Sequence, residues 1–255
     1  IQEAPQSEGE AIEAVRGADA IMMRGGWGTE QVIRAADQAQ VLAVYSHGFN
    51  HIDVDAATDM GIIVTNGAGM CAEEVSNQAV TMALALNRQV VQTTNQLRNT
   101  GSWDRSAFMP IGAIDEQTLG IIGFGNIGRQ VARKLGQGWR METLVYDPYV
   151  APWIISEYGV EQVFEINELC ERSDYIIVVV PLNTETFHMV GAEQFDHMKK
   201  SAFYINVCRG SVTDEPAMIA ALQAGKIRGA GLDVFEQEPV DPANPLLQME
   251  NVITA

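Results

Sequence analysis

Three glycines with the spacing of a phosphate-binding turn stand between an apolar segment and a helical one. They are Gly123, Gly125 and Gly128, within GIIGFGNIGRQVARKL at residues 120–135. Isolated glycines weaken helices and strands, so a cluster of them indicates a special demand on the backbone. In a strand–turn–helix context the first glycine turns the chain, the second lets a pyrophosphate approach, and the third lets helix and strand pack closely. Exposed N–H groups at the helix start would face the phosphates.

The residues around the glycines predict that strand–turn–helix context. Isoleucines at 121–122 precede the turn, and Ile127, Val131 and Leu135 follow it at intervals of four residues, which places them on one helical face. Asn126 and Ile127 therefore belong to the predicted dinucleotide-binding loop together with the three glycines. A glycine-rich turn alone is common, so the next strand has to test this interpretation.

The next predicted strand, TLVYD at residues 143–147, ends in an acid. Asp147 lies 19 residues after Gly128, where a dinucleotide-binding fold places the carboxylate that binds the adenosine ribose hydroxyls. A carboxylate there also repels a 2′-phosphate, so the sequence favours NAD over NADP. The alternative is an aspartate that only begins the turn Asp147-Pro148. Glycines, helix and spacing together favour the cofactor.

Composition limits the partners and the compartment. The 255 residues are enough for two domains, and the formal net charge of −17 argues against nucleic acid and anionic membranes. Cys71, Cys170 and Cys208 are too few and too scattered for a disulfide framework or a zinc site, so we expect no metal and a reducing, cytoplasmic compartment. No apolar run reaches membrane-spanning length. The chain begins at Ile1 rather than Met, so we expect the true N-terminus to lie outside it.

Helix and strand signals alternate along the chain, which predicts βαβ units and parallel sheets. The expected helices are 8–17, 28–36, 53–60, one long helix over 71–97, the helix after the glycines, and 214–225. The expected strands are 18–24, 39–46, 61–66, the strand before the glycines, 143–147, 174–181, 202–207, 229–235 and 251–254. We therefore expect an α/β protein with two doubly wound parallel-sheet lobes and a boundary near residues 67–72.

Seven segments from about residue 41 onward resemble, in order, those of the D-isomer-specific 2-hydroxyacid dehydrogenases. They are GFNHIDVDAATDMGIIVTN, GIIGFGNIG, VYDPY, VVVPLNTETFHMV, MKKSAFYINVCRGSVTDEPAMIAAL, GKIRGAGLDVFEQEP and NPLLQMENVIT. The resemblance implies interconversion of a small 2-oxo acid and a D-2-hydroxy acid with NAD. It also implies a homodimer that packs through the long helix, an incomplete flavodoxin-like substrate domain over 1–70, and a Rossmann-type NAD-binding domain over 71–255.

The resemblance supplies catalytic roles that the chemistry supports. Hydride addition to a keto carbon pushes charge onto oxygen, so the site needs a cation and a proton donor. Arg209, after a predicted strand, matches the arginine that polarises the carbonyl and grips the substrate carboxylate. Glu238 matches the acid that raises the pKa of a catalytic histidine. Asp233 matches the residue that binds the nicotinamide carboxamide. The alternatives are a surface ion pair for the arginine and a solvent-facing glutamate.

Further positions follow from the same resemblance. Pro181 and Leu182 would line the adenine pocket, although side chains packed in the core would show the same sequence pattern. Cys208 is also expected to bind the cofactor. Backbone amides near His47 and Gly48 would receive the substrate carboxylate.

Other positions depart from the family pattern or lie near its motifs. Val44 stands where some members carry an arginine, which disfavours a phosphorylated substrate. Glu236 is expected to face solvent, and His188 and His197 are expected to be structural or solvent-facing. The family's catalytic histidine falls beyond Ala255.

Three functions fit this sequence. The first is an NAD-dependent dehydrogenase acting on glyoxylate, hydroxypyruvate or pyruvate. The second is an NAD(H)-responsive interaction protein like the corepressors that share this fold, and the third is a formate or phosphite dehydrogenase. The Arg209 and Glu238 pair does not separate the first two. The absence of a basic or disordered tail favours the dehydrogenase.

Overall fold

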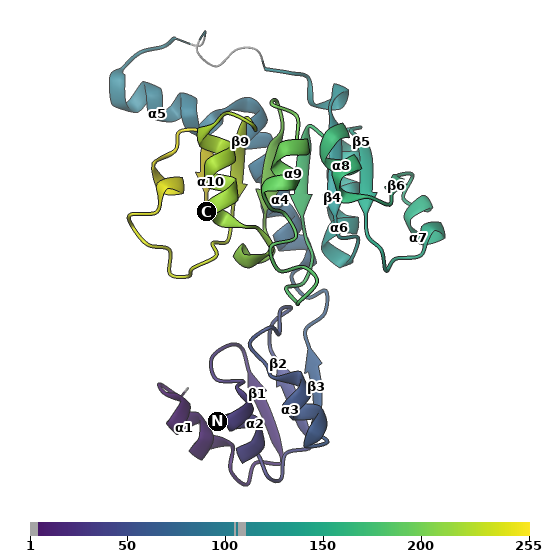
Figure 1. The fold of residues 1–255 in the computed structure, drawn as a ribbon, viewed down its shortest axis with the longest axis vertical. Coiled ribbons are helices and arrows are strands. Elements are labelled where there is room, and N and C mark those ends of the chain that lie inside the picture. The colour runs from purple at the N-terminus through teal and green to yellow at the C-terminus, as the bar shows by residue number, and fades with distance from the viewer. Residues whose placement is uncertain (1–4, 105, 107–110) are drawn as a thin grey trace. The chain divides into compact units, whose positions relative to one another are not determined.

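The computed structural model describes residues 5–104, 106 and 111–255, and the chain divides into two compact units, Ile1–Cys71 and Ala72–Ala255 (Figure 1). Each unit contains a parallel β-sheet, with three strands in the first unit and seven in the second among the described residues. The predicted α/β class is thus confirmed.

The first unit is a short βαβ series around its own core. Its elements are α1 (Glu8–Val15), β1 (Ala20–Met23), α2 (Glu30–Ala35), β2 (Val41–Val44), α3 (Val54–Asp59) and β3 (Ile63–Asn66). The strands are parallel and lie in the order β1-β2-β3. Leu42 and Val44 of β2 are buried against Val32 and Ile33 of α2 and Ala57 of α3. All six elements fall within the segments predicted from sequence.

The second unit carries the longer series of alternating helices and strands. Its elements are α4 (Ala72–Arg88), α5 (Val90–Thr100), β4 (Thr118–Ile122), α6 (Asn126–Val131), β5 (Glu142–Tyr146), α7 (Pro152–Ser156), β6 (Glu161–Val163), α8 (Ile166–Arg172), β7 (Tyr175–Val178), α9 (Ala192–His197), β8 (Phe203–Asn206), α10 (Glu215–Gln223), β9 (Gly229–Leu232) and β10 (Val252–Thr254). The strands lie in the order β10-β9-β8-β7-β4-β5-β6, and all their pairings are parallel.

Helices cover both faces of the seven-stranded sheet, as the nearly uniform apolar character of β7 requires. Tyr175 and Ile177 of β7 face a hydrophobic cluster with residues of α4 and α6. Ile176 and Val178 face a second cluster with residues of α8, α9 and α10. Figure 1 shows these two helical layers, with α8, α9 and α10 on one side of the sheet and α4 and α6 on the other. All four β7 side chains are buried.

The strand order reverses between β4 and β7, and this reversal positions the candidate site. From β4 the chain continues outward through β5 and β6, and then returns to the other side of β4 to form β7 and the strands beyond it. Because all the strands are parallel, the segments that follow β4, β5, β7, β8 and β9 emerge at one edge of the sheet. Ligands of doubly wound sheets bind outside the carboxyl ends of the strands at such a reversal.

The predicted single helix over 71–97 is wrong, because the chain forms two helices there. Gln89 adopts a left-handed backbone (φ 51°) between α4 and α5. Leu86 is buried, and Asn87 donates to the carbonyl of Gly112 and the hydroxyl of Tyr175. These contacts fix the end of α4 on the sheet, whereas α5 has no buried residue. No proline or glycine marks the break, so the sequence pattern gave no sign of it.

Several smaller elements were also not predicted. The helices α7, α8 and α9 lie outside the helical segments expected from sequence. The edge strand β6 has only three residues, too few for a recognisable alternation. After α6 the helix continues as a π-helical turn, Ala132–Gly138, so Leu135 reaches the core from that turn while Val131 reaches it from α6. Both side chains are fully buried, as the spacing predicted, and Ile127 packs against the same cluster.

Candidate cofactor and catalytic site

The three glycines after β4 meet different steric demands. Gly123 has a φ of 97°, and a Cβ there would lie 2.8 Å from the carbonyl oxygen of Val179. A Cβ on Gly128 would lie 2.2 Å from the carbonyl oxygen of Gly123. These two glycines are therefore required by the turn and by helix–strand packing. A Cβ on Gly125 would meet no atom within 4 Å. Internal packing therefore does not explain this glycine.

Asp147 joins the turn after β5 to the glycine loop. Its Oδ2 accepts a hydrogen bond from the backbone N–H of Phe124 over 2.7 Å. Its Oδ1 accepts from the N–H groups of Tyr149 and Val150 over 2.9 Å and 3.1 Å. The turn that the sequence offered as an alternative is therefore present, and the same carboxylate also lies beside the candidate phosphate-binding loop.

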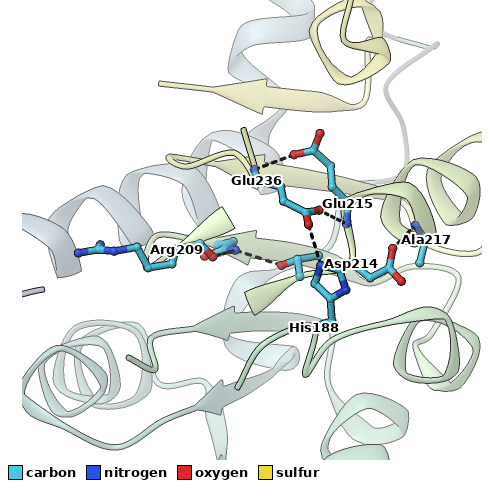
Figure 2. A network of polar contacts seen from close by, with 8 residues as sticks. His188, Arg209, Asp214, Glu215, Ala217 and Glu236 are labelled. Atoms are coloured by element: carbon cyan, nitrogen blue, oxygen red, sulfur yellow. Dashed lines mark hydrogen bonds and ion pairs between the residues drawn. The ribbon is translucent and has the colours of Figure 1, made fainter. Parts of the chain in front are cut away.

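Arg209 follows β8 in a turn that is packed tightly against the segment after β9. Its Nη1 donates to the carbonyl of Cys208 over 2.6 Å, and its own carbonyl accepts from Asn206 over 2.9 Å. A Cβ on the neighbouring Gly210 would lie 1.9 Å from the carbonyl carbon of Phe235, so the two segments touch through their backbones. Figure 2 shows the Arg209 guanidinium pointing away from the carboxylates of Asp214 and Glu236.

Asp233 and Glu238 lie on the segment that follows β9. The backbone N–H of Asp233 donates to the carbonyl of Asn206 at the end of β8, over 3.0 Å. Its Oδ1 accepts from Nε2 of Gln78 over 2.9 Å. Burial raises the pKa of the Asp233 carboxyl, the Gln78 hydrogen bond lowers it, and the nearby charge of Glu238 raises it. Glu238 is exposed, and its Oε1 accepts from the N–H of Phe235 over 3.0 Å.

The prediction that Glu236 faces solvent is wrong. Its Oε1 lies 2.7 Å from Nε2 of His188, and its Oε2 accepts from the N–H of Glu215 over 3.3 Å. In return, its own N–H donates to Oε2 of Glu215 over 3.0 Å. Figure 2 shows this network at the start of α10, where Asp214 caps the helix through the N–H of Ala217. His188, expected to be structural or solvent-facing, is partly buried in this network.

The residues assigned to the adenine side occupy different environments. Pro181 is exposed just after β7, and its carbonyl accepts from the hydroxyl of Thr186 over 2.6 Å. Leu182 is partly buried against the core cluster below it. The Cys208 thiol is turned inward, with Sγ 3.2 Å from Oδ1 of Asn206, and burial raises its pKa to about 11.

In the first unit, His47 and Gly48 form the turn after β2. The Ser46 hydroxyl donates to the carbonyl of Gly48 over 2.7 Å, and Nδ1 of His47 accepts from the N–H of Gly69 over 3.2 Å. Among the described residues, no backbone hydrogen bond uses the N–H of His47 or of Gly48. The turn therefore offers two amide donors. Val44, at the end of β2, is buried in the core of this unit.

Two contacts were not predicted from the sequence. Glu215 and Glu236 each accept a hydrogen bond from the other's backbone N–H, and no residue pattern indicates such a contact. Gln78 could have been found, because it lies four residues before Met82 and eight before Leu86 on the buried face of α4. A glutamine on an apolar stripe indicates a polar partner inside the fold.

Among the residues that the structure describes, no group of three or more His, Cys, Asp or Glu side chains is arranged to hold a metal ion. No helix in the same residues has the length and apolar character needed to cross a membrane.

A doubly wound parallel sheet with a glycine turn after β4 and an acid after β5 defines a dinucleotide-binding protein of the Rossmann type. Residues 80–255 match the family model described as D-isomer specific 2-hydroxyacid dehydrogenase, NAD binding domain. The chain belongs to the D-isomer-specific 2-hydroxyacid dehydrogenases, a family of oxidoreductases, and its cofactor is NAD.

Individual relatives are similar over nearly the whole chain. The D-3-phosphoglycerate dehydrogenase of Methanocaldococcus jannaschii is 42% identical over 245 residues, which cover 96% of this chain but only 46% of that protein. The glyoxylate reductase of Korarchaeum cryptofilum is 40% identical over 258 residues, covering 99% of this chain and 76% of that protein. A crystal structure of D-lactate dehydrogenase from Aquifex aeolicus with NAD and lactic acid has a TM-score of 0.86 at 29% identity, covering 96% of this chain and 77% of that one.

Proposed function

We propose that the protein interconverts a small 2-oxo acid and the corresponding D-2-hydroxy acid by NAD-dependent hydride transfer. One observation carries this proposal. The glycine loop, Asp147, Arg209 and Asp233 all follow strands of one parallel sheet and emerge at its carboxyl edge. In this proposal residues 71–255 form the NAD-binding domain, and residues 1–70 contribute to the substrate-binding domain.

The cofactor contacts follow from the local geometry. The pyrophosphate would bind the loop from Gly123 through Asn126 and Ile127 to Gly128, where Gly125 leaves the open approach. The ribose hydroxyls would donate to Asp147, and Pro181 with Leu182 would flank the adenine. Cys208 would contribute through packing, because its thiol is turned toward Asn206. When bound, NADH supplies the hydride.

Arg209 would carry the electrostatic part of the reaction. The hydride adds to the keto carbon, and the carbonyl electron pair moves onto the oxygen. A guanidinium stabilises that charge and can also hold the substrate carboxylate through two parallel N–H···O bonds. The close backbone contact between Gly210 and Phe235 fixes the turn that presents this side chain.

Glu238 would act on the proton donor. The Phe235 N–H holds one of its oxygens, which orients the exposed carboxylate. We assign the proton donor to the histidine that the family resemblance implies, because His188 and His197 are hydrogen-bonded to Glu236 and Glu171 and not to Glu238. A carboxylate next to an imidazole favours the protonated ring and keeps the proton available for the alkoxide oxygen.

The substrate is proposed to be small and without a phosphate group. The amides of His47 and Gly48 would receive its carboxylate. Val44 is buried and uncharged, so that position offers no contact to a phosphate. Glyoxylate, hydroxypyruvate and pyruvate meet these conditions, and the relative from Korarchaeum cryptofilum is a glyoxylate reductase.

We further propose a cytoplasmic homodimer that associates through α5. This helix has no buried residue within the described chain, and Val90, Val91 and Leu97 are exposed on it. Figure 1 shows α5 extending away from the sheet. Apolar side chains gathered on one helix favour association with a second copy.

The test is NADH oxidation, followed by absorbance, with glyoxylate, hydroxypyruvate, pyruvate and 3-phosphohydroxypyruvate. Parallel assays would use NADPH with each acid, and NAD with formate or phosphite. Rapid oxidation of NADH by one of the first three acids is the expected result. Binding of NADH without reduction of any acid would contradict the proposal and favour an NADH-responsive interaction protein. Oxidation of formate or phosphite would reassign the reaction within the same fold.

A further inference from the structure

A glutamine from α4 holds the aspartate proposed to bind the nicotinamide. Nε2 of Gln78 donates to Oδ1 of Asp233 over 2.9 Å, across 155 residues of sequence. We propose that Gln78 is a positioning residue for Asp233. Its hydrogen bond holds the Asp233 carboxylate in the orientation that receives the nicotinamide carboxamide. This inference rests on the proposed role of Asp233.

The contact depends on an unusually close approach between α4 and β9. A Cβ on Gly231 would lie 3.1 Å from Cβ of Met82 and 3.4 Å from Cδ1 of Leu86, so the helix lies directly on the bare strand backbone. Gln78 precedes Met82 by one helical turn and lies on the same stripe. Asp233 lies two residues after Gly231, on the same face of the extended chain. The missing side chain at Gly231 thus brings Gln78 within reach of Asp233.

The chemistry of the pair suits an acceptor for a carboxamide. The glutamine amide is a neutral donor and occupies only one carboxylate oxygen, so Oδ2 of Asp233 keeps acceptor sites for a second N–H group. Burial and the charge of Glu238 both favour protonation of Asp233, and the Gln78 hydrogen bond opposes it. Gln78 therefore fixes the direction of the carboxylate and also helps to keep it an acceptor.

The experiment compares NADH with ADP-ribose, which has the adenosine diphosphate but no nicotinamide. Dissociation constants for both would be measured by titration calorimetry on the wild-type protein, Gln78→Leu and Gln78→Glu. Leucine removes the donor at similar size, and glutamate replaces the amide with a second carboxyl beside Asp233. We expect NADH binding to weaken roughly fivefold or more in both variants, while ADP-ribose binding stays unchanged and shows that the variants are folded.

Two further variants make the result specific. Gln223→Leu makes the same replacement on α10, at an exposed position where no side-chain hydrogen bond of Gln223 is present in the described chain, and should leave both ligands unaffected. In the background of Asp233→Ala, the replacement Gln78→Leu should cause no further loss of NADH affinity, because the two residues act as one unit.

The outcomes distinguish failure of the proposed role of Gln78 from failure of the proposed NAD-dependent function. Equal weakening of NADH and ADP-ribose in Gln78→Leu, an unchanged NADH affinity, or a full additional loss in the Asp233→Ala background would each overturn the role of Gln78. Wild-type affinity of Asp233→Ala for NADH would instead overturn the proposed nicotinamide contact, and the inference would fall with it. Failure of the wild-type protein to bind either ligand would contradict the NAD site itself.

Discussion

The carboxylate of Asp147 accepts a hydrogen bond from the backbone N–H of Phe124, with 2.7 Å between Oδ2 and the nitrogen. Phe124 is the residue between the first two glycines of the loop, so the acid directly after β5 helps to fix the turn that follows β4. Gly123 completes the link, since its N–H donates to the carbonyl of Tyr146 over 2.9 Å. The proposed ribose and pyrophosphate subsites are thus built as one unit.

Replacing Asp147 should change cofactor selectivity. Asp147→Asn keeps the side-chain size and an acceptor for the Phe124 amide but removes the negative charge that repels a 2′-phosphate. We expect the ratio of NADPH to NADH affinity to rise by about tenfold or more, equivalent to about 1.4 kcal/mol. Titration of both cofactors measures the ratio, and Asp55→Asn on α3 is the control. An unchanged ratio would show that Asp147 serves only its turn.

The glycines of the loop should separate stability from binding. Gly128→Ala places a Cβ 2.2 Å from the carbonyl oxygen of Gly123, so we expect a loss of about 1–3 kcal/mol in the free energy of unfolding. Gly125→Ala meets no atom within 4 Å, so its melting temperature should stay close to that of the wild type while NADH binding weakens. Thermal unfolding and NADH titration test both variants. Normal NADH affinity in folded Gly125→Ala would remove the reason given for this glycine.

Arg209 should be needed for catalysis more than for cofactor binding. Lysine keeps the charge but lacks the planar fork that grips a carboxylate, so Arg209→Lys should lower kcat/KM by about 10²–10³ and leave the dissociation constant of NADH unchanged. Steady-state kinetics and NADH titration measure the two effects. Arg140→Lys, whose side chain is 80% exposed beside Asp115, is the matched control. A parallel loss of NADH affinity would assign Arg209 to the cofactor instead.

Most of the sheet could be predicted from sequence because its strands are buried on both faces. β7 shows the reason, since a continuous apolar run between polar ends has few other interpretations. The glycine loop was predictable because steric demands at Gly123 and Gly128 restrict the residue type. In both cases the constraint, burial of the strand or close packing at the glycines, acts on the residues of the pattern themselves and so is visible in the local sequence.

The failures involve contacts that the chain makes with distant segments. The break at Gln89 depends on Asn87 bonding to Gly112 and Tyr175, and nothing in the local sequence records those partners. Glu236 looked like a solvated acid because its partners, Glu215 and His188, lie 21 and 48 residues away. Tertiary packing therefore decided the outcome at each of these positions.

The three thiols should differ in reactivity. Burial raises the pKa of Cys208 to about 11 and that of Cys170 to about 12, so both stay protonated near pH 8. Cys71 is only partly buried. A disulfide reagent at pH 8 should modify Cys71 rapidly in the folded protein and all three thiols in denaturant, as mass spectrometry of digests can show. Rapid labelling of folded Cys208 would contradict its inward position.

The pH dependence of stability should carry the signature of Asp233. Burial raises the pKa of this carboxyl above its ordinary value of 3.8. Between the unfolded and the folded pKa, the folded state therefore holds a proton that the unfolded state has already released. The free energy of unfolding therefore falls as the pH rises from about 4 through the folded pKa.

Asp233→Asn removes this loss and keeps an acceptor for Gln78. The melting temperature of Asp233→Asn minus that of the wild type should thus increase from pH 4 to pH 7, followed by circular dichroism. Gln223→Leu removes no ionisable group and serves as the control. A difference that shrinks with rising pH would mean that the Gln78 hydrogen bond outweighs burial, and that Asp233 is ionised more easily in the folded protein than in the unfolded chain.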